Sequence, residues 1–178
     1  MCEVHSATCV LDTSARPDQL RVLADNHVGV EDRCAKAYQV AVAVGSHLVD
    51  SVRSIAHKDM SLAFVSPATA ASGFTTSTFS FNLPALVNGD NEALAQRFVD
   101  LLVAERKDLF KPCVSFGQDN GLVYCTVPAT STQGAIKAED KAKQALGGVQ
   151  LTRLSFPPTI DVDAVNHVID NALKKIYQ

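Results

Sequence analysis

Three residues near the start of the chain have side chains that can bind a metal or take part in redox chemistry. Cys2, His5 and Cys9 lie within the stretch MCEVHSATCV. A structural zinc site uses four ligands, often as two close pairs, and the best second pair here is Cys113 with Cys125. In a strand, however, His5 and Cys9 share one face and Cys2 points to the other. We therefore favour buried thiols that pack as small apolar groups, and expect no metal and no cofactor; a metal site and a redox or nucleophilic role are the alternatives.

The histidines do not gather with other reactive residues along the sequence. His47 lies near Ser46 and Asp50, but on a helix these residues form a polar face, and His167 likewise falls on the polar side of the last predicted helix. No nucleophile elbow, phosphate-binding loop or zinc-protease motif occurs. The sequence thus predicts no catalytic residue, and it favours a protein that is not an enzyme. The alternative is an enzyme that acts on small molecules and whose active site is assembled from residues distant in sequence.

Composition narrows the classes of partner and compartment. The chain has 178 residues, 47% of them hydrophobic and 20% charged, with a net charge of −3. These values are ordinary for a soluble globular protein and give no electrostatic reason to expect a nucleic acid or an anionic membrane as partner. The first basic residue is Arg16, so a signal peptide is not expected, and the five cysteines are an odd number. We expect free thiols in the cytoplasm or another reducing compartment, not a secreted protein.

The second part of the chain has the clearer pattern of elements. Phe79 and Phe81 alternate with polar residues in a strand, and Asp90 can cap the helix that follows. Further along, the sequence predicts a hairpin at 113–127, a helix from about 132 to 147, a strand at 149–156 with a bulge or an edge position, and a helix capped by Asp161. The order from 75 to 156 is that of a ferredoxin-like, split βαβ core. The predicted fold class is therefore α+β, with residues 71–178 forming this core plus a terminal helix.

Residues 1–70 are expected to form an N-terminal helical extension. A short helix is predicted at 16–25 and a long one at 30–57, where apolar residues recur every three or four positions. The alternative for 37–45 is a strand, because Val40, Val42 and Val44 also alternate. We favour the helix, and expect another strand at 60–65.

One face of the predicted sheet is too apolar to remain in contact with water. The hairpin register makes Phe116 and Tyr124 cross-strand neighbours, and places Val114 and Leu122 on the same face. These four residues are our interface candidate, to be covered either by the N-terminal helix or by a second molecule.

Two segments of the predicted sheet resemble the RNA-recognition motif. FSFNLP at 79–84 resembles the first-strand signature of that family, and NGLVYCTV at 120–127 resembles its third-strand signature. The sequence departs from the family at Asn120, where a basic residue is usual, and at Leu122, where a stacking aromatic is usual. The resemblance implies a nucleic-acid-binding module, in which Tyr124 would stack on a base.

The leading interpretation is a non-enzymatic interaction or self-assembly subunit. Its expected partner is another copy of the chain, in a homo-oligomer. A nucleic-acid-binding module resembling the RNA-recognition motif is the first alternative but is disfavoured, because its predicted strands carry no Lys or Arg. No membrane partner is expected.

Overall fold

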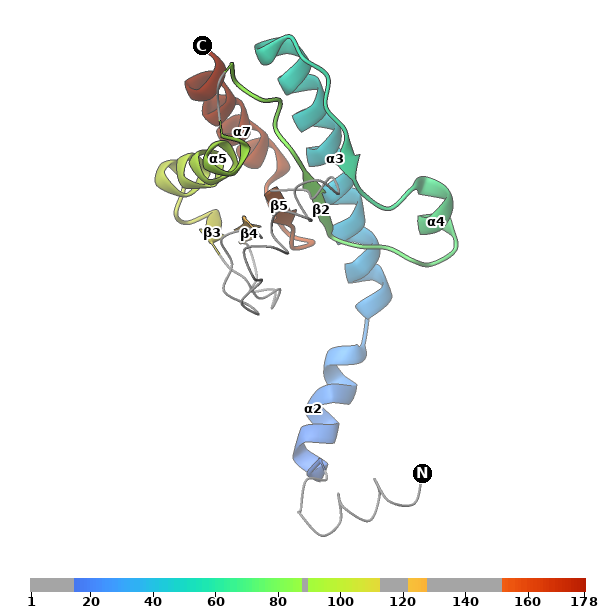
Figure 1. Cartoon of the computed structure of the whole chain (residues 1–178). Coiled ribbons are helices and arrows are strands. Elements are labelled where there is room, and N and C mark those ends of the chain that lie inside the picture. The colour runs from blue at the N-terminus through green and yellow to red at the C-terminus, as the bar shows by residue number, and fades with distance from the viewer. Residues whose placement is uncertain (1–14, 88–89, 113–121, 128–151) are drawn as a thin grey trace, which may run out of the picture. The chain divides into compact units, whose positions relative to one another are not determined.

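The computed structural model describes residues 15–87, 90–112, 122–127 and 152–178. The chain divides into two compact units, Met1–Arg33 and Cys34–Gln178, each described here by itself. The described residues form five helices and a five-stranded mixed sheet, so the predicted α+β class is confirmed (Figure 1). This division lies after Arg33, and the division after residue 70 that the sequence suggested stays a prediction. None of the described helices is long and apolar enough to cross a bilayer.

Helix α2, Pro17–His27, makes up most of the described part of the first unit and confirms the predicted short helix. Pro17 suits the first turn, where its missing N–H would have no helical partner. The backbone N–H of Arg16 donates to Oε1 of Gln19 at 2.9 Å. After the helix, the guanidinium of Arg33 donates to the carbonyl oxygen of Val28 at 2.6 Å and to that of Asn26. These bonds satisfy polar groups that the helix ends leave open.

Helix α3, Val30–Ala56, begins in the first unit and continues through the second. It covers residues 37–45, so the helix is confirmed there and the alternative strand is wrong. Of the predicted apolar stripe, Ala41, Val44 and Leu48 are fully buried, whereas Cys34 is exposed. At Gly45 the helix backbone approaches the sheet so closely that a Cβ atom would lie 2.8 Å from Cδ1 of Leu62.

The sheet contains β1 (Leu62–Ala63), β2 (Thr78–Phe81), β3 (Phe110–Pro112), β4 (Val123–Thr126) and β5 (Thr152–Ser155), in the order β1-β2-β5-β4-β3. Neighbours pair antiparallel except β3 and β4, which are parallel. The predicted ferredoxin-like core is not confirmed. That core would place β2 next to β4, whereas here β5 lies between them. Most of the predicted hairpin, residues 113–121, lies outside the described residues. The strand β5 lies between β2 and β4, so of the two predicted alternatives, a bulge or an edge position, the edge position is wrong.

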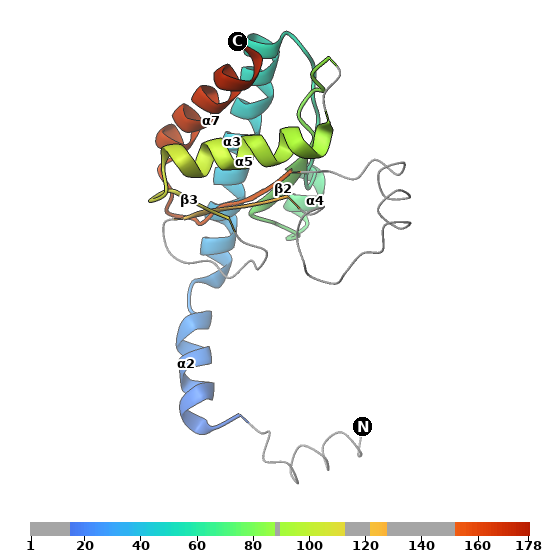
Figure 2. The same ribbon diagram turned by 60° about the vertical axis from the view of Figure 1, so that its left-hand side comes forward.

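Helices α3, α5 (Asn91–Glu105) and α7 (Val162–Tyr177) share one core with the sheet. Figure 2 shows α5 lying across one face of the sheet, with α7 beside it. Phe79, Leu154 and Cys125 lie opposite one another in the ladders and are at most 1% exposed, so this face forms part of the hydrophobic core. The remaining helix, α4 (Pro67–Ala71), has no buried residue.

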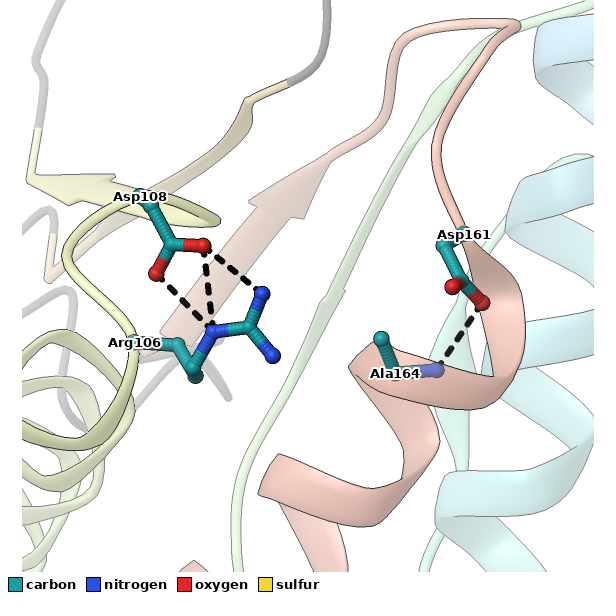
Figure 3. A network of polar contacts seen from close by, with 4 residues as sticks. All are labelled: Arg106, Asp108, Asp161 and Ala164. Carbon is teal, nitrogen blue, oxygen red and sulfur yellow. Dashed lines mark hydrogen bonds and ion pairs between the residues drawn. The ribbon is translucent and has the colours of Figure 1, made fainter.

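Local polar contacts set the ends of α5 and α7. As predicted, Asp90 caps α5 by accepting a bond from the N–H of Glu92 at 2.8 Å, and Asp161 caps α7 by accepting from that of Ala164 at 3.1 Å. At the other end of α5, Arg106 holds Asp108 with contacts of 2.7–3.2 Å in the turn that leads to β3 (Figure 3). These hydrogen bonds lower the pKa of the Asp108 carboxyl. The predicted helix at 132–147 lies outside the described residues.

Candidate functional site

The interface candidate predicted from the sequence is only partly described by the structure. Val114 and Phe116 lie outside the described residues, and Leu122 is half-buried. Tyr124 is 2% exposed and lies on the sheet face opposite Phe79 and the core, as the alternation of β4 requires. In the described ladders Tyr124 faces Lys111 on one side and Ser155 on the other.

The described part of the Tyr124 face carries hydroxyl groups and cations in addition to the aromatic ring. The Nζ atom of Lys111 lies 5.9 Å from the centre of the Tyr124 ring, a distance suited to a cation–π contact. Thr78 donates a hydrogen bond to Oγ of Ser155 at 3.0 Å. Nε of Arg153 donates to Oγ of Ser80 at 3.4 Å. This part of the face is therefore more polar than the four apolar residues of the interface candidate predicted.

Helix α3 does not cover the Tyr124 face. Its Gly45 lies against the ring of Phe79, so closely that a Cβ atom on Gly45 would be 3.4 Å from Cε1 of that ring. The side chain of Phe79 belongs to the core face, which is the opposite one. The expectation that the long helix would act as a lid over Tyr124 is thus wrong.

A cluster of Ser51, His47 and Asp170 joins α3 to α7. Oγ of Ser51 donates to Oδ1 of Asp170 at 2.6 Å, and Nε2 of His47 lies 2.9 Å from the same oxygen. Nε2 of His47 also lies 3.1 Å from Oγ of Ser51. Ser51 is 8% exposed, while the other two side chains are about 30% exposed. The sequence pointed instead to Ser46 and Asp50, because Asp170 is 123 residues away from His47.

The geometry of this cluster is that of a structural contact. In a catalytic triad the base uses one ring nitrogen for the nucleophile and the other for the carboxylate. Here both Ser51 and Asp170 contact the same nitrogen of His47. The single hydroxyl proton of Ser51 is directed at the carboxylate, so it is not shared with the imidazole. We conclude that these side chains clamp two helices together.

A second polar network links α5 to α7. Nδ2 of Asn171 donates to Oε1 of Glu105 at 2.6 Å, and Nζ of Lys175 donates to Oε2 at 3.0 Å. Nε2 of His167 lies 3.1 Å from the same amide nitrogen. The hydrogen bond from Asn171 is the largest cause that lowers the pKa of the Glu105 carboxyl, and Lys175 acts in the same direction against partial burial. His167 thus contacts Asn171 within α7, beside the link to Glu105.

The predicted metal-binding candidates are mostly beyond the described part of the chain. Cys2, His5, Cys9 and Cys113 lie outside the described residues. The side chain of Cys125 is buried in the core, as the alternation of the sequence favoured, and Cys34 is a free thiol at the surface.

Helix α2 presents apolar side chains that were not among the residues predicted to form an interface. No residue of this helix is buried, and Leu20, Val22 and Leu23 are 53%, 58% and 66% exposed. Because each residue advances about 100° around a helix, Leu20 and Leu23 lie on one side and Val22 on another. The spacing of the two leucines was the signal that could have identified this surface.

Comparisons with known proteins bear on the fold. No protein-family model matches the sequence, and no curated protein matches it. Among solved structures, cystathionine gamma-lyase from yeast is similar with a TM-score of 0.56 and 23% sequence identity, over 82% of this chain and 35% of that one. The chain therefore spans about a third of the length of the lyase, and the likeness is one of fold.

Proposed function

We propose that this chain is a non-enzymatic interaction subunit that assembles with a second copy of itself. The observation that carries the proposal is the exposure of Leu20 and Leu23 on a helix with no buried residue. Large apolar side chains that lie together at a surface mark a contact site for another molecule.

The length of α2 supports the same proposal. An isolated helix shorter than about 12–15 residues is marginal in water, and most helix stability in proteins comes from packing of an apolar face. Helix α2 has 11 residues. A partner that covers Leu20 and Leu23 would supply the missing packing, since full burial of one leucine side chain contributes about 1.5–3 kcal/mol.

The test is the mass of the protein in solution, measured by light scattering over a wide range of concentrations. We expect an oligomer for the natural sequence and a monomer for Leu23→Asp, because the new carboxylate would be buried in the contact. The control is Val22→Asp, which introduces the same charge into the same helix on another side and should leave the mass unchanged.

Two results would contradict this proposal. A natural sequence that remains monomeric at every concentration would show that the chain does not assemble with itself. An oligomer that dissociates equally in both variants would show that α2 contributes through its general stability and not through the side that bears Leu20 and Leu23.

A second candidate function follows from the likeness to the yeast lyase. The region of the lyase that matches this chain makes up 35% of the lyase, so the lyase contains further protein outside the matched region. The chain here would then act as one domain of a larger enzyme related in fold to cystathionine gamma-lyase. Cleavage of cystathionine by the purified chain, assayed alone and with the remaining two thirds of such an enzyme, tests this candidate: activity that needs both parts supports it.

A further inference from the structure

Two residues interrupt a helical stretch that would otherwise run from Pro17 to Ala56. Val28 and Gly29 separate α2 from α3, and both lie within the unit Met1–Arg33 (Figure 1). The ψ angle of Val28 is 123°, an extended conformation, and the φ angle of Gly29 is +70°, in the left-handed region. That region is unfavourable for a residue with a Cβ atom, so the break depends on the glycine.

The side chain of Arg33 stabilises this break. Its guanidinium donates to the carbonyl oxygen of Val28 at 2.6 Å and to that of Asn26. In a continuous helix these two oxygens would instead accept bonds from backbone N–H groups four residues further along. No residue of α2 is buried, and Val28 is 75% exposed. The broken form is therefore held by a few exposed hydrogen bonds and by one glycine, and not by burial of α2.

The periodic spacing of the sequence runs across the break. Residues at intervals of three, four and three positions are Leu20, Leu23, His27 and Val30, of which His27 is the polar member. The same intervals continue in α3 through Cys34 to the buried Ala37 and Ala41. Such spacing places side chains along one side of a single helix and is typical of a coiled-coil seam. A continuous helix would therefore join the part of this stripe on α2 to the part on α3.

We propose that the break is a conformational switch, held in its broken form by Arg33. When the guanidinium leaves the two carbonyl oxygens, Val28 and Gly29 become helical and α2 continues directly into α3. The continuous form presents Leu20, Leu23 and Val30 as one seam, so a second copy of the chain binds this form in preference to the broken one. This preference rests on the proposed assembly, whereas the switch is a property of a single chain.

The Cα shifts of residues 28 and 29 in carbon NMR distinguish the two forms, because helical and extended backbones displace these shifts in opposite directions. We expect non-helical shifts at both positions in the natural chain. Gly29→Ala should move both towards helical values, because it disfavours the left-handed conformation and favours the helix, which changes the ratio of the two forms by roughly tenfold or more. Helical shifts in the natural chain, or a shift of Val28 that is unchanged by Gly29→Ala, would overturn the proposal.

Arg33→Ala tests whether the guanidinium holds the broken form. It should raise the ratio of the continuous to the broken form about fivefold, the scale of one net hydrogen bond. The matched control is Lys36→Ala, which removes another exposed cation near the start of α3 and should leave the shift of Val28 unchanged. Equal changes in the two variants would overturn the role of Arg33.

Light scattering separates the switch from the proposed assembly. If the natural chain assembles with itself, Gly29→Ala should lower the concentration of half-dissociation at least fivefold, because it populates the form with the continuous seam. An assembling chain whose dissociation is unchanged by Gly29→Ala would overturn the preference of the second copy for that form. A chain that stays monomeric throughout would contradict the proposed function, and the NMR shifts decide the switch in either case.

Discussion

Ser51 shows how a single side chain can fix the position of two helices. It is nearly buried on α3, and its hydroxyl donates to the carboxylate of Asp170 on α7 at 2.6 Å. A hydrogen bond to a charged group contributes about 1.5–3 kcal/mol, more than the usual value for a neutral pair. The hydrogen bond between Ser51 and Asp170 therefore contributes more to stability than a bond between two neutral groups would.

We predict that Ser51→Ala lowers the free energy of unfolding by about 1–2 kcal/mol, because the lost hydrogen bond outweighs the gain in helix propensity. Ser46→Ala is the control, since it makes the same change on an exposed position of α3 and should alter stability by less than about 0.5 kcal/mol. Denaturant unfolding measures both. Equal effects of the two substitutions would show that the clamp contributes nothing beyond propensity.

At the scale of elements, α5 and α7 are joined through Glu105. Its carboxylate accepts bonds from Asn171 and Lys175, and the pKa of the carboxyl is lowered as a result. A carboxyl whose pKa is lowered in the folded state stabilises the fold at pH values above the pKa of the unfolded state, which is about 4.3. That stabilisation is lost as the pH falls through the pKa of the folded state, which is lower than that of the unfolded state.

We predict that Asn171→Ala and Lys175→Ala each raise the pKa of Glu105 towards its ordinary value, because the hydrogen bond from Asn171 and the ammonium group of Lys175 both lower it. Lys174→Ala removes a neighbouring charge without removing the bond to Glu105 and should have a smaller effect. Carboxyl-carbon NMR titration measures each value. The stability difference between the natural protein and Lys175→Ala should also shrink below about pH 4. If Lys174→Ala and Lys175→Ala changed the pKa of Glu105 by equal amounts, the contact between Lys175 and Glu105 would be contradicted.

At the scale of the whole molecule, the two faces of the sheet differ in character. One face packs with α3, α5 and α7 in a shared core. The other face carries Tyr124, whose ring is 2% exposed beside Lys111. A base can stack on an aromatic side chain only where the ring is accessible. Base stacking on Tyr124, which the resemblance to the RNA-recognition motif implies, therefore stays a prediction that requires this ring to become accessible.

We predict that labelled single-stranded RNA binds no more tightly than about 1 µM at roughly 150 mM salt, the upper limit of non-specific affinity. Any weak binding should fall by similar amounts in Lys111→Ala and Lys107→Ala, as expected for contacts with phosphate alone. Fluorescence anisotropy provides the measurement. Tighter binding that is lost only in Lys111→Ala would show that the sheet face does recognise RNA.

The sequence by itself determined those features that depend on neighbouring residues. Asp90 and Asp161 were identified as helix caps, and both accept the backbone bonds expected of them. The stripe in α3 was identified from its spacing of three and four residues. Such signals are local, because a cap and a helical face are built from residues within a few positions of one another.

Only the tertiary structure decided which strands pair and which distant side chains meet. Backbone hydrogen-bonding groups are the same in every strand, so the alternation of β4 did not reveal that its neighbours are a parallel β3 and an antiparallel β5. Likewise, nothing near His47 in sequence indicated Asp170. Alternation fixes the face of a side chain, whereas the order of strands and the docking of helices follow from how the whole core packs.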